Sequence, residues 1–206
     1  MDIPQKKSQL RAAIRGRLRT LTGKERSMES RTLCRTLGKL LLGESLTLRR
    51  AQGQARAVAC LTIAAYVPLR DEADIMPLLL TLLDGKHALF LPRVEGGAMV
   101  FRQVRSLERL PVGAFGIPEP PPDAPLLDPL RLNSALIPGR AFDRKGNRLG
   151  RGNGGYDHWI AAQRQAHPST RFFGVCLECQ LVQEVPVEAH DERVDAVVTA
   201  RGLISV

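Results

Sequence analysis

VACLTIAAYV, residues 58–67, is a continuous apolar run. Such a run is typical of a strand buried on both faces, because a half-exposed strand alternates apolar and polar residues. DIMPLLLTLLD (74–84) then predicts a helix, with Pro77 in its first turn and Gly85 at its end. A second apolar run, HALFLPRV (87–94), predicts the next buried strand. This strand–helix–strand order is the pattern of parallel strands joined by a crossover helix.

The remainder of the chain continues this alternation. Residues 111–129 hold seven of the fourteen prolines and predict an extended crossing segment, and residues 139–155 predict a long glycine-rich loop. The further predicted elements are strands at 98–104, 134–138, 172–177 and 195–199 and a helix at 156–166. The pattern predicts an α/β fold with a largely parallel sheet that is covered on both faces. Ligands bind at the carboxyl ends of such strands, so we expect the loops there to form one cleft.

Two helices are predicted before the first strand. The first covers residues 4–22, where apolar residues recur every three or four positions. The second covers residues 24–43, with Thr22 as its cap, and we expect Gly43 to end it. Residues 44–56 are predicted to form a polar loop.

The net charge of +9 lies in residues 1–50, which carry 13 Lys and Arg against 4 Asp and Glu. The rest of the chain carries 17 of each kind. Lys7, Arg11, Arg15 and Arg19 recur every four residues and form one stripe along the first helix. Three interpretations of this stripe stay open: a nucleic-acid contact, a solvated helical face, or a set of cations for a small polyanion.

Composition bounds the class of protein. With 206 residues, 44% of them hydrophobic and 25% charged, the chain predicts one globular domain, 1–206, on which the basic segment 1–50 packs. No apolar run reaches the roughly 18–20 residues of a membrane span, and the N-terminus lacks a secretory signal pattern. We therefore expect a cytoplasmic protein. The four cysteines include one lone C-x-x-C pair, Cys176 and Cys179, which is too few ligands for a structural zinc and predicts buried, reduced thiols.

The glycine-rich segment RLGRGNGGYD, residues 148–157, is the most informative stretch for function. Glycines let backbone amides approach an anion closely, and the following helix adds the partial positive charge of its N-terminus. Arg148 and Arg151 supply permanently charged, bidentate donors. The spacing matches neither the Walker nor the Rossmann pattern, and a flexible surface loop is the alternative. The concentration of arginine favours phosphate binding.

Three acids accompany this loop. Asp157 follows it directly and has two interpretations, as a complement to the helix N-terminus or as a ligand of Mg²⁺. Asp191, in the segment EAHD, is a candidate second carboxylate, whereas His190 beside it is interpreted as structural. Glu72 follows the first buried strand, and its alternative is an exposed acid in a turn.

Six segments, taken together and in this order, resemble a known family. They are KSQLR (7–11), YVPLRDE (66–72), LPR (91–93), GIPEP (116–120), PGRAFDRKGNRLGRGNGGYD (138–157) and ECQLVQEVPVEAHDERVDAVVT (178–199). The family is that of 5-formyltetrahydrofolate cyclo-ligases, also called methenyltetrahydrofolate synthetases. The resemblance spans essentially the whole chain.

The resemblance implies a ligase of one-carbon metabolism. Its reaction would be the ATP- and Mg²⁺-dependent cyclisation of 5-formyltetrahydrofolate to 5,10-methenyltetrahydrofolate, with release of ADP and phosphate, through phosphorylation of the formyl oxygen. It also implies a three-layer α/β/α fold like that of the sugar-phosphate isomerase and CoA-transferase group. The partners would be these small molecules, without nucleic acid or membrane, and we expect a monomer.

The resemblance also assigns roles to matching positions. Arg151 and Tyr156 would be the catalytic residues, and Val67 and Glu72 would contact the folate. The ATP-binding residues would be Lys7, Arg11, Arg148, Leu149, Gly150, Arg151, Gly152, Asn153, Gly154, Gly155 and Tyr156, and the magnesium ligands would be Asp157 and Asp191.

The glycine-rich loop departs from the usual family pattern at two positions. Asn153 replaces a glycine and Gly155 replaces the first of two aromatic residues, which leaves Tyr156 alone. Because Asn tolerates left-handed backbone geometry, we expect the shape of the loop to survive.

Two other classes of function remain as alternatives. One is a non-catalytic folate-binding relative that lost turnover through Asn153 and Gly155. The other is a nucleic-acid-binding module built on the first helix. Aromatic residues make up 4% of the chain and none lies between the cations of residues 7–19, so the stacking platforms of single-strand binders are lacking there.

Overall fold

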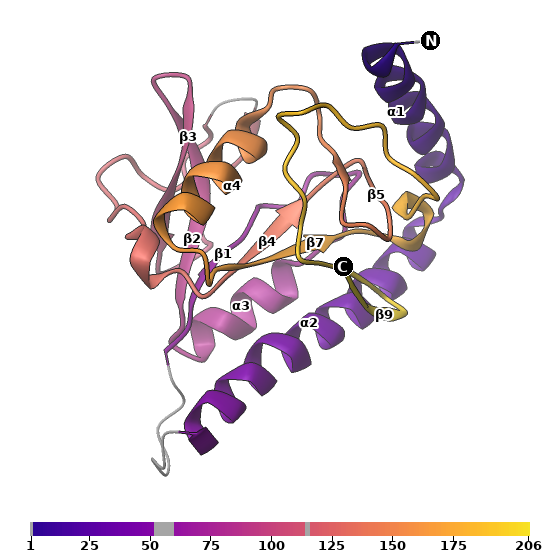
Figure 1. Cartoon of the computed structure of the whole chain (residues 1–206). Helices are drawn as coiled ribbons and strands as arrows, with labels where there is room; N and C mark the ends of the chain where they lie inside the picture. The colour runs from indigo at the N-terminus through magenta and orange to yellow at the C-terminus, as the bar shows by residue number, and fades with distance from the viewer. Residues whose placement is uncertain (1, 52–59, 114–115) are drawn as a thin grey trace.

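A seven-stranded sheet in the order β3-β2-β1-β4-β7-β8-β9 forms the centre of the computed structural model, which describes residues 2–51, 60–113 and 116–206. Its strands are β1 (Thr62–Ala64), β2 (Ala88–Glu95), β3 (Ala98–Val104), β4 (Ser134–Pro138), β7 (Arg171–Val175), β8 (Ala196–Thr199) and β9 (Gly202–Ser205). The inner strands β2, β1, β4, β7 and β8 run parallel, and β3 and β9 are antiparallel to their neighbours. The predicted α/β fold with a largely parallel sheet is confirmed (Figure 1).

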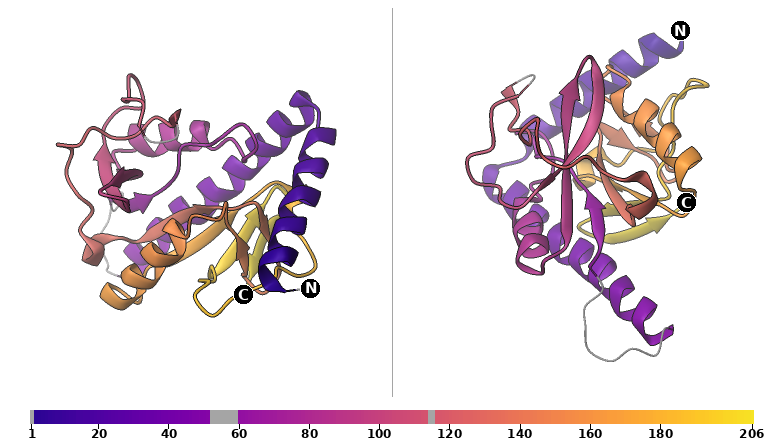
Figure 2. Two further views of the ribbon diagram at one scale, coloured as in Figure 1. Left: turned by 90° about the horizontal axis from the view of Figure 1, so that it is seen from above. Right: turned by 90° about the vertical axis from the view of Figure 1, so that its left-hand side faces the viewer.

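Helices cover both faces of this sheet. They are α1 (Ile3–Thr20), α2 (Gly23–Ala51), α3 (Met76–Asp84) and α4 (Gly155–Ala166), together with the 3₁₀ turns η2 (Pro129–Arg131) and η3 (Glu178–Gln180). α2 and α3 pack together on one face and α4 lies on the other, which gives three layers (Figure 1). α1 lies beside the C-terminal part of the chain (Figure 2) and contacts η3, where Arg17 donates to the carbonyl of Cys179.

The strand order reverses next to β1. The chain leaves β1 for β2 on one side, whereas β4 pairs with β1 on the other, as in the register Ile63–Ser134. In an open parallel sheet the loops at such a reversal diverge and leave a crevice at the carboxyl ends of the strands. The loop after β1 and the glycine-rich loop after β4 therefore meet at this point.

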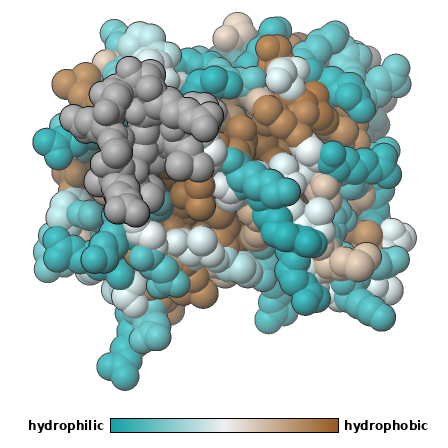
Figure 3. Space-filling view, turned by 90° about the horizontal axis from the view of Figure 1, so that it is seen from below, coloured by the Kyte–Doolittle hydropathy of each residue, from teal (hydrophilic) through white to brown (hydrophobic). Residues whose placement is uncertain are grey.

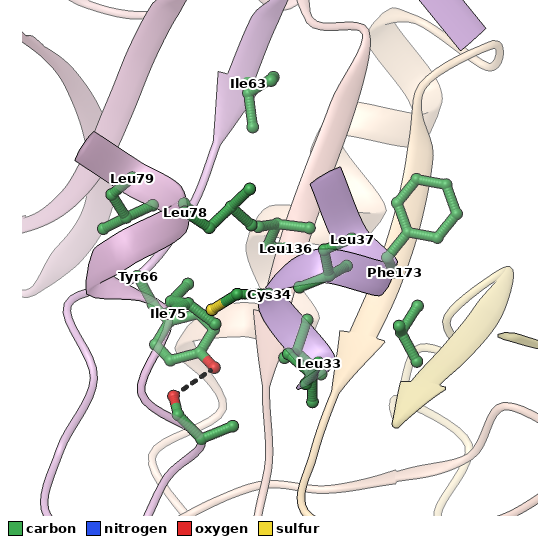
Figure 4. Close-up of a cluster of buried hydrophobic side chains, with 14 of the residues drawn as sticks. Leu33, Cys34, Leu37, Ile63, Tyr66, Ile75, Leu78, Leu79, Leu136 and Phe173 are labelled. Carbon is green, nitrogen blue, oxygen red and sulfur yellow. Dashed lines mark hydrogen bonds between the residues drawn. The ribbon is translucent and has the colours of Figure 1, made fainter. Parts of the chain in front are cut away.

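One hydrophobic core fills the space between the sheet and the pair α2–α3 (Figure 4). Leu33, Cys34 and Leu37 of α2 point toward Leu136 of β4 and Phe173 of β7. All five side chains are buried, and Ile14 and Leu18 of α1 join the same cluster. The basic N-terminal segment is thus attached by a buried apolar stripe, in agreement with the helical periodicity predicted for it.

A second core lies under α4. Trp159 of this helix packs on Phe101 of β3 at 4.1 Å between ring centroids and meets Phe172 of β7 edge-on at 5.9 Å. Phe142 and Ile160, both fully buried, complete the cluster. This packing fixes the helix whose N-terminus receives the glycine-rich loop.

The helix predicted over 24–43 is longer than expected. Thr22, the predicted cap, forms a capping box with Glu25, in which Glu25 N donates to Thr22 Oγ1 at 3.2 Å and Thr22 N donates to Glu25 Oε2 at 2.8 Å. The prediction that Gly43 ends the helix is wrong, because α2 continues to Ala51. One glycine costs a helix only about 1 kcal/mol, which a long helix in a leucine-rich segment tolerates. Of the loop predicted at 44–56, residues 52–56 lie outside the described residues.

Smaller differences concern strands. The first strand was predicted over 58–67, but residues 58 and 59 lie outside the described residues and β1 covers three residues. The loop predicted at 139–155 contains the two-stranded ribbon β5 (Ala141–Phe142) and β6 (Arg148–Leu149). The edge strand β9 was not predicted. The cysteines are free, as expected, but Cys60 is exposed rather than buried.

On the face viewed from below, brown apolar residues show between teal hydrophilic side chains (Figure 3). In the part of the chain that the structure describes, no helix combines the length and apolar character needed to cross a bilayer.

Candidate active site

A cavity of about 340 Å³ opens at the carboxyl ends of β1, β2 and β4. Most of its wall is apolar and comes from the loop after β1, from β2 and β3, and from the start of α4. The apolar residues that line it are Tyr66, Val67, Leu69, Pro92, Val94, Met99, Ile117, Pro138 and Tyr156. Val67, predicted to contact the folate, is therefore in the cavity wall. An apolar cavity with a few convergent polar groups is the usual form of a small-molecule site.

The first of these polar groups is the pair Glu72–Arg151. Arg151 donates to Glu72 Oε1 from Nε at 3.2 Å and from Nη2 at 2.8 Å. The backbone amide of Leu69 holds the other carboxylate oxygen at 3.0 Å. Glu72 is 8% exposed, so the interpretation as an exposed turn acid is wrong, whereas the Arg151 side chain is one-third exposed. A predicted folate contact and a predicted catalytic residue, 79 positions apart, thus meet in the cavity wall.

Arg148 lies deeper in the same wall. It is 5% exposed, and its Nη2 donates to Asp157 Oδ1 at 2.8 Å. Its guanidinium also lies 5.5 Å from the ring centroid of Tyr156, within cation–π range. Burial raises the pKa of Tyr156, and the negative charge of Glu72 raises it further. The phenol is therefore protonated at physiological pH and is a hydrogen-bond donor.

The glycine-rich loop crosses in front of these side chains. Gly152 and Gly154 have φ values of +108° and +68°, and Gly154 is the N-cap of α4. Asn153 between them does not have a positive φ, so its tolerance of left-handed geometry is not what preserves the loop. Arg11 of α1 donates from Nε to the carbonyl of Gly150 at 3.0 Å. Backbone amides at the start of α4 thus lie beside a cation from α1.

The remaining predicted loop residues divide into two groups. Gly150, Asn153 and Gly155 line the cavity. Leu149 is buried in β6 and pairs with Ala141, so its side chain belongs to the core.

Lys7 and Asp191 meet at the edge of the site. Lys7 Nζ donates to Asp191 Oδ2 at 2.6 Å and to Glu188 Oε2 at 2.8 Å. Burial works to lower the pKa of Lys7, but the hydrogen bonds to both carboxylates outweigh it and raise the pKa. Burial likewise works to raise the pKa of Asp191, but the hydrogen bond from Lys7 outweighs it and lowers the pKa. Both side chains are therefore charged at neutral pH.

The carboxylates near Lys7 belong to a group of side chains with the geometry to hold a metal ion. Glu188, His190 and Asp191 place one ligand atom each within 4.8 Å of one another. Oxygen ligands of this kind suit Mg²⁺, and the contact of both carboxylates with the Lys7 ammonium shows that they accept a shared cation. Among the described residues, this three-residue group contains Asp191 but not Asp157, whose Oδ1 accepts from Arg148 and from the amide of Glu192. Sequence reasoning missed Glu188.

A second buried pair in the cavity wall was also missed. Glu119, 5% exposed, lies 3.5 Å from Nη1 of Arg93, which also donates to the carbonyl of Pro120 at 2.9 Å. Both residues lie in quoted segments, LPR and GIPEP, but nothing in the spacing of those segments indicates that they meet. The cavity wall therefore has two arginine–carboxylate pairs: Glu72–Arg151, which joins two loops, and Arg93–Glu119, which joins β2 to the crossing segment.

Comparison with known proteins identifies the group to which this fold and site belong. The model of the 5-formyltetrahydrofolate cyclo-ligase family matches residues 3–200. The chain belongs to this family. The resemblance of the six segments is thereby confirmed over residues 3–200 of the chain.

Individual relatives agree with this assignment. The 5-formyltetrahydrofolate cyclo-ligase of Mycolicibacterium smegmatis is 30% identical over 213 residues, which cover 98% of each chain. The cyclo-ligase of Escherichia coli K12 is 34% identical over 142 residues, which cover 67% of this chain and 77% of that protein. The solved structure of 5,10-methenyltetrahydrofolate synthetase from Aquifex aeolicus superposes with a TM-score of 0.75 at 30% identity and covers 97% of this chain and 92% of that one.

Proposed function

We propose that this cyclo-ligase family member converts 5-formyltetrahydrofolate to 5,10-methenyltetrahydrofolate at the expense of ATP, with Mg²⁺ as cofactor. The family assignment and the names of the relatives supply the substrate and the product. The observation that carries the proposal is the meeting of an apolar cavity with a cationic, glycine-rich loop at one edge of the sheet. These two surfaces suit the two substrates, a flat heterocycle and a polyphosphate.

The cavity is the proposed folate site. Its apolar wall suits the rings of the pterin, and Val67 lies in that wall. Glu72 is the proposed polar contact because its carboxylate is buried and fixed by the Leu69 amide. A fixed carboxylate accepts hydrogen bonds from the amino and ring N–H groups of a pterin without reorganising.

The glycine-rich loop is the proposed nucleotide site. The amides from Gly150 to Tyr156 and the N-terminus of α4 would bind phosphate oxygens, and Arg11 already contacts this loop. Lys7 and Arg148 would add charge from either side. Because Arg148 is buried against Asp157, we assign it to shaping the loop and to the electrostatic field more than to direct contact.

The reaction proposed for this site has two steps. The formyl oxygen attacks the γ-phosphorus of ATP, the bond to the bridging oxygen breaks, and ADP leaves. N10 of the folate then attacks the formyl carbon, its proton is lost, and the carbon–oxygen bond breaks to release phosphate. Arg151 stabilises the charge on the transferred phosphoryl group, and the protonated Tyr156 donates a hydrogen bond to it. Holding N10 next to the activated carbon makes ring closure intramolecular, which contributes about 7–11 kcal/mol at best.

Among the described residues, we propose Glu188 and Asp191 as the magnesium ligands and Asp157 as a further candidate. Bound there, the ion would neutralise phosphate charge. Lys7 would then exchange its carboxylate partners for phosphate oxygens. We further propose that the protein is a monomer and that it is cytoplasmic. The four free thiols fit the cytoplasmic location.

The direct test mixes the purified protein with ATP, Mg²⁺ and 5-formyltetrahydrofolate and follows the absorbance of the methenyl product. We expect product that depends on both ATP and the metal. Tight folate binding without any product would overturn the proposal in favour of a non-catalytic relative. Arg131→Ala, whose side chain is 80% exposed on η2, is the control variant and should match the parent chain.

A further inference from the structure

Arginines from three separate segments gather around the glycine-rich loop, and one of them, Arg151, lines the cavity. Arg11 comes from α1, Arg140 from the turn after β4, and Arg151 from the glycine-rich loop. Arg140 lies in the segment 138–157 that resembles the family, but that resemblance assigns no role to it. Its side chain is mostly buried, with 18% exposed, so it is held near the site and is not a freely solvated surface group.

A single carboxylate joins two of these arginines. Arg151 Nη2 donates to Asp71 Oδ1 at 2.6 Å, and Arg140 Nη1 donates to Asp71 Oδ2. Each oxygen of one carboxylate therefore accepts from a different guanidinium. Because a guanidinium has five N–H donors, each arginine retains capacity for another anion.

The local charge is unbalanced. Among the described residues, Asp71 is the carboxylate within ion-pair distance of Arg140, and Asp71 and Glu72 are those that pair with Arg151. Burial, together with the nearby positive charges of Arg151, Arg15 and Arg11, lowers the pKa of Arg140 to about 10. Asp71 and Glu72 pair with Arg140 and Arg151, whereas the charges of Arg11 and Arg15 also act on Arg140. Mutual repulsion of this kind is relieved by a bound polyanion.

We infer that Arg140 is a further phosphate-binding residue, which acts with Arg151 on the terminal phosphate of the nucleotide. This inference rests on the proposed function. Asp71 is the positioning residue, because it holds both guanidinium groups on one anionic centre before the nucleotide arrives. Planar, bidentate guanidinium groups are suited to a phosphoryl group that carries charge on three oxygens.

Nucleotide binding to the full chain tests this assignment. The affinities of Arg140→Gln for ADP and for a non-hydrolysable ATP analogue are compared by calorimetry with those of the parent chain. We expect the analogue to bind about 10- to 100-fold more weakly, the effect of losing one hydrogen bond to a charged group, while ADP binding changes little. Arg144→Gln, which removes an exposed arginine from the adjacent turn, is the matched control and should bind both nucleotides normally.

Kinetic measurements show which polyanionic group Arg140 binds, the phosphates of the nucleotide or the glutamate carboxylates of the folate. We expect Arg140→Gln to raise KM for ATP and to leave KM unchanged for substrates with one or several glutamates. A raised KM confined to the polyglutamylated substrate would overturn the assignment, as would equal losses for ADP and the ATP analogue. If Arg140→Gln does not fold, Arg140→Lys provides the test, because it keeps the charge. This variant should prefer the ATP analogue over ADP by a smaller factor than the parent chain does. A parent chain without turnover would defeat the proposed function, whereas the calorimetric comparison would still decide the role of Arg140.

Discussion

Lys7 and Asp191, 184 positions apart, are joined by an ion pair of 2.6 Å. The pair ties the first helix to the loop before β8, and Glu188 gives the same ammonium a second partner at 2.8 Å. Both members of the Lys7–Asp191 pair have about a tenth of their side chains exposed, so water screens the attraction only weakly. This contact places a charge of the basic helix beside the proposed nucleotide site.

The pH dependence of stability follows from this pair. The lowered pKa of Asp191 means that its contribution is full above its ordinary pKa of 3.8 and is lost as the pH falls through the lowered value. The raised pKa of Lys7 means that its contribution is full below 10.5 and is lost as the pH rises through the raised value. We therefore expect Lys7→Gln to destabilise the protein by about 1–3 kcal/mol at pH 7 and by less at pH 2. Urea unfolding at the two pH values measures this, with the exposed Lys6→Gln as control, and an equal loss at both would contradict it.

Replacement of Arg151 separates its chemical role from its structural one. We expect Arg151→Ala to lower kcat by about 100-fold or more, because it removes charge stabilisation from phosphoryl transfer. Its loss leaves the buried Glu72 unpaired, which costs about 1–3 kcal/mol of stability without unfolding the chain. Steady-state kinetics and thermal unfolding measure the two effects. A folded variant with near-normal turnover would remove Arg151 from the mechanism.

Tyr156 is expected to act as a protonated donor. Tyr156→Phe removes the hydroxyl but keeps the ring under the guanidinium of Arg148. We predict a fall in kcat of about 10-fold, the effect of one hydrogen bond. Since burial holds the pKa of the phenol above its ordinary value of 10, the pH–rate profile below pH 9 should keep its shape in the variant. A basic limb that disappears in Tyr156→Phe would show instead that the tyrosine ionises during turnover.

The two aspartates proposed for magnesium are predicted to behave differently. Asp157→Asn leaves the buried Arg148 without its carboxylate, so we expect a loss of about 3–5 kcal/mol in stability. Asp191→Asn keeps most of the fold but should raise the magnesium concentration for half-maximal activity by about 10-fold, because a carboxylate ligand becomes an amide. Activity titrations with Mg²⁺ and thermal unfolding of both variants test this. An unchanged titration for Asp191→Asn would exclude that residue from the metal site.

The sequence predicts the sheet and most of its helices because burial imposes a pattern. The strand predicted at 134–138, SALIP, corresponds to β4, in which all five residues are buried. The short edge strand β9 alternates between half-buried and exposed residues over four positions, a signal too brief to detect. Gly43 shows the opposite error, because α2 continues to Ala51 through a residue with poor helix propensity.

Site residues were predictable where chemistry is concentrated in sequence, as in the glycine-rich loop. Pairings across the fold were not, because Glu72–Arg151 joins two loops that only the reversal of strand order beside β1 brings together. Arg140 lies in an ordinary turn by sequence. The structure indicates a role for it, because Asp71 forms ion pairs both with Arg140 and with Arg151, eleven positions later.

The crossing segment after β3 has a further consequence for the behaviour of the chain in concentrated solution. Gln103 donates its amide to the carbonyl of Pro125, and Leu127 donates to the carbonyl of Phe101, so this segment satisfies part of the outer rim of β3. Proline offers no amide hydrogen of its own, so the segment is a poor template for adding a strand from another molecule. The sheet is thereby protected on that side against the lateral stacking that leads to fibrils.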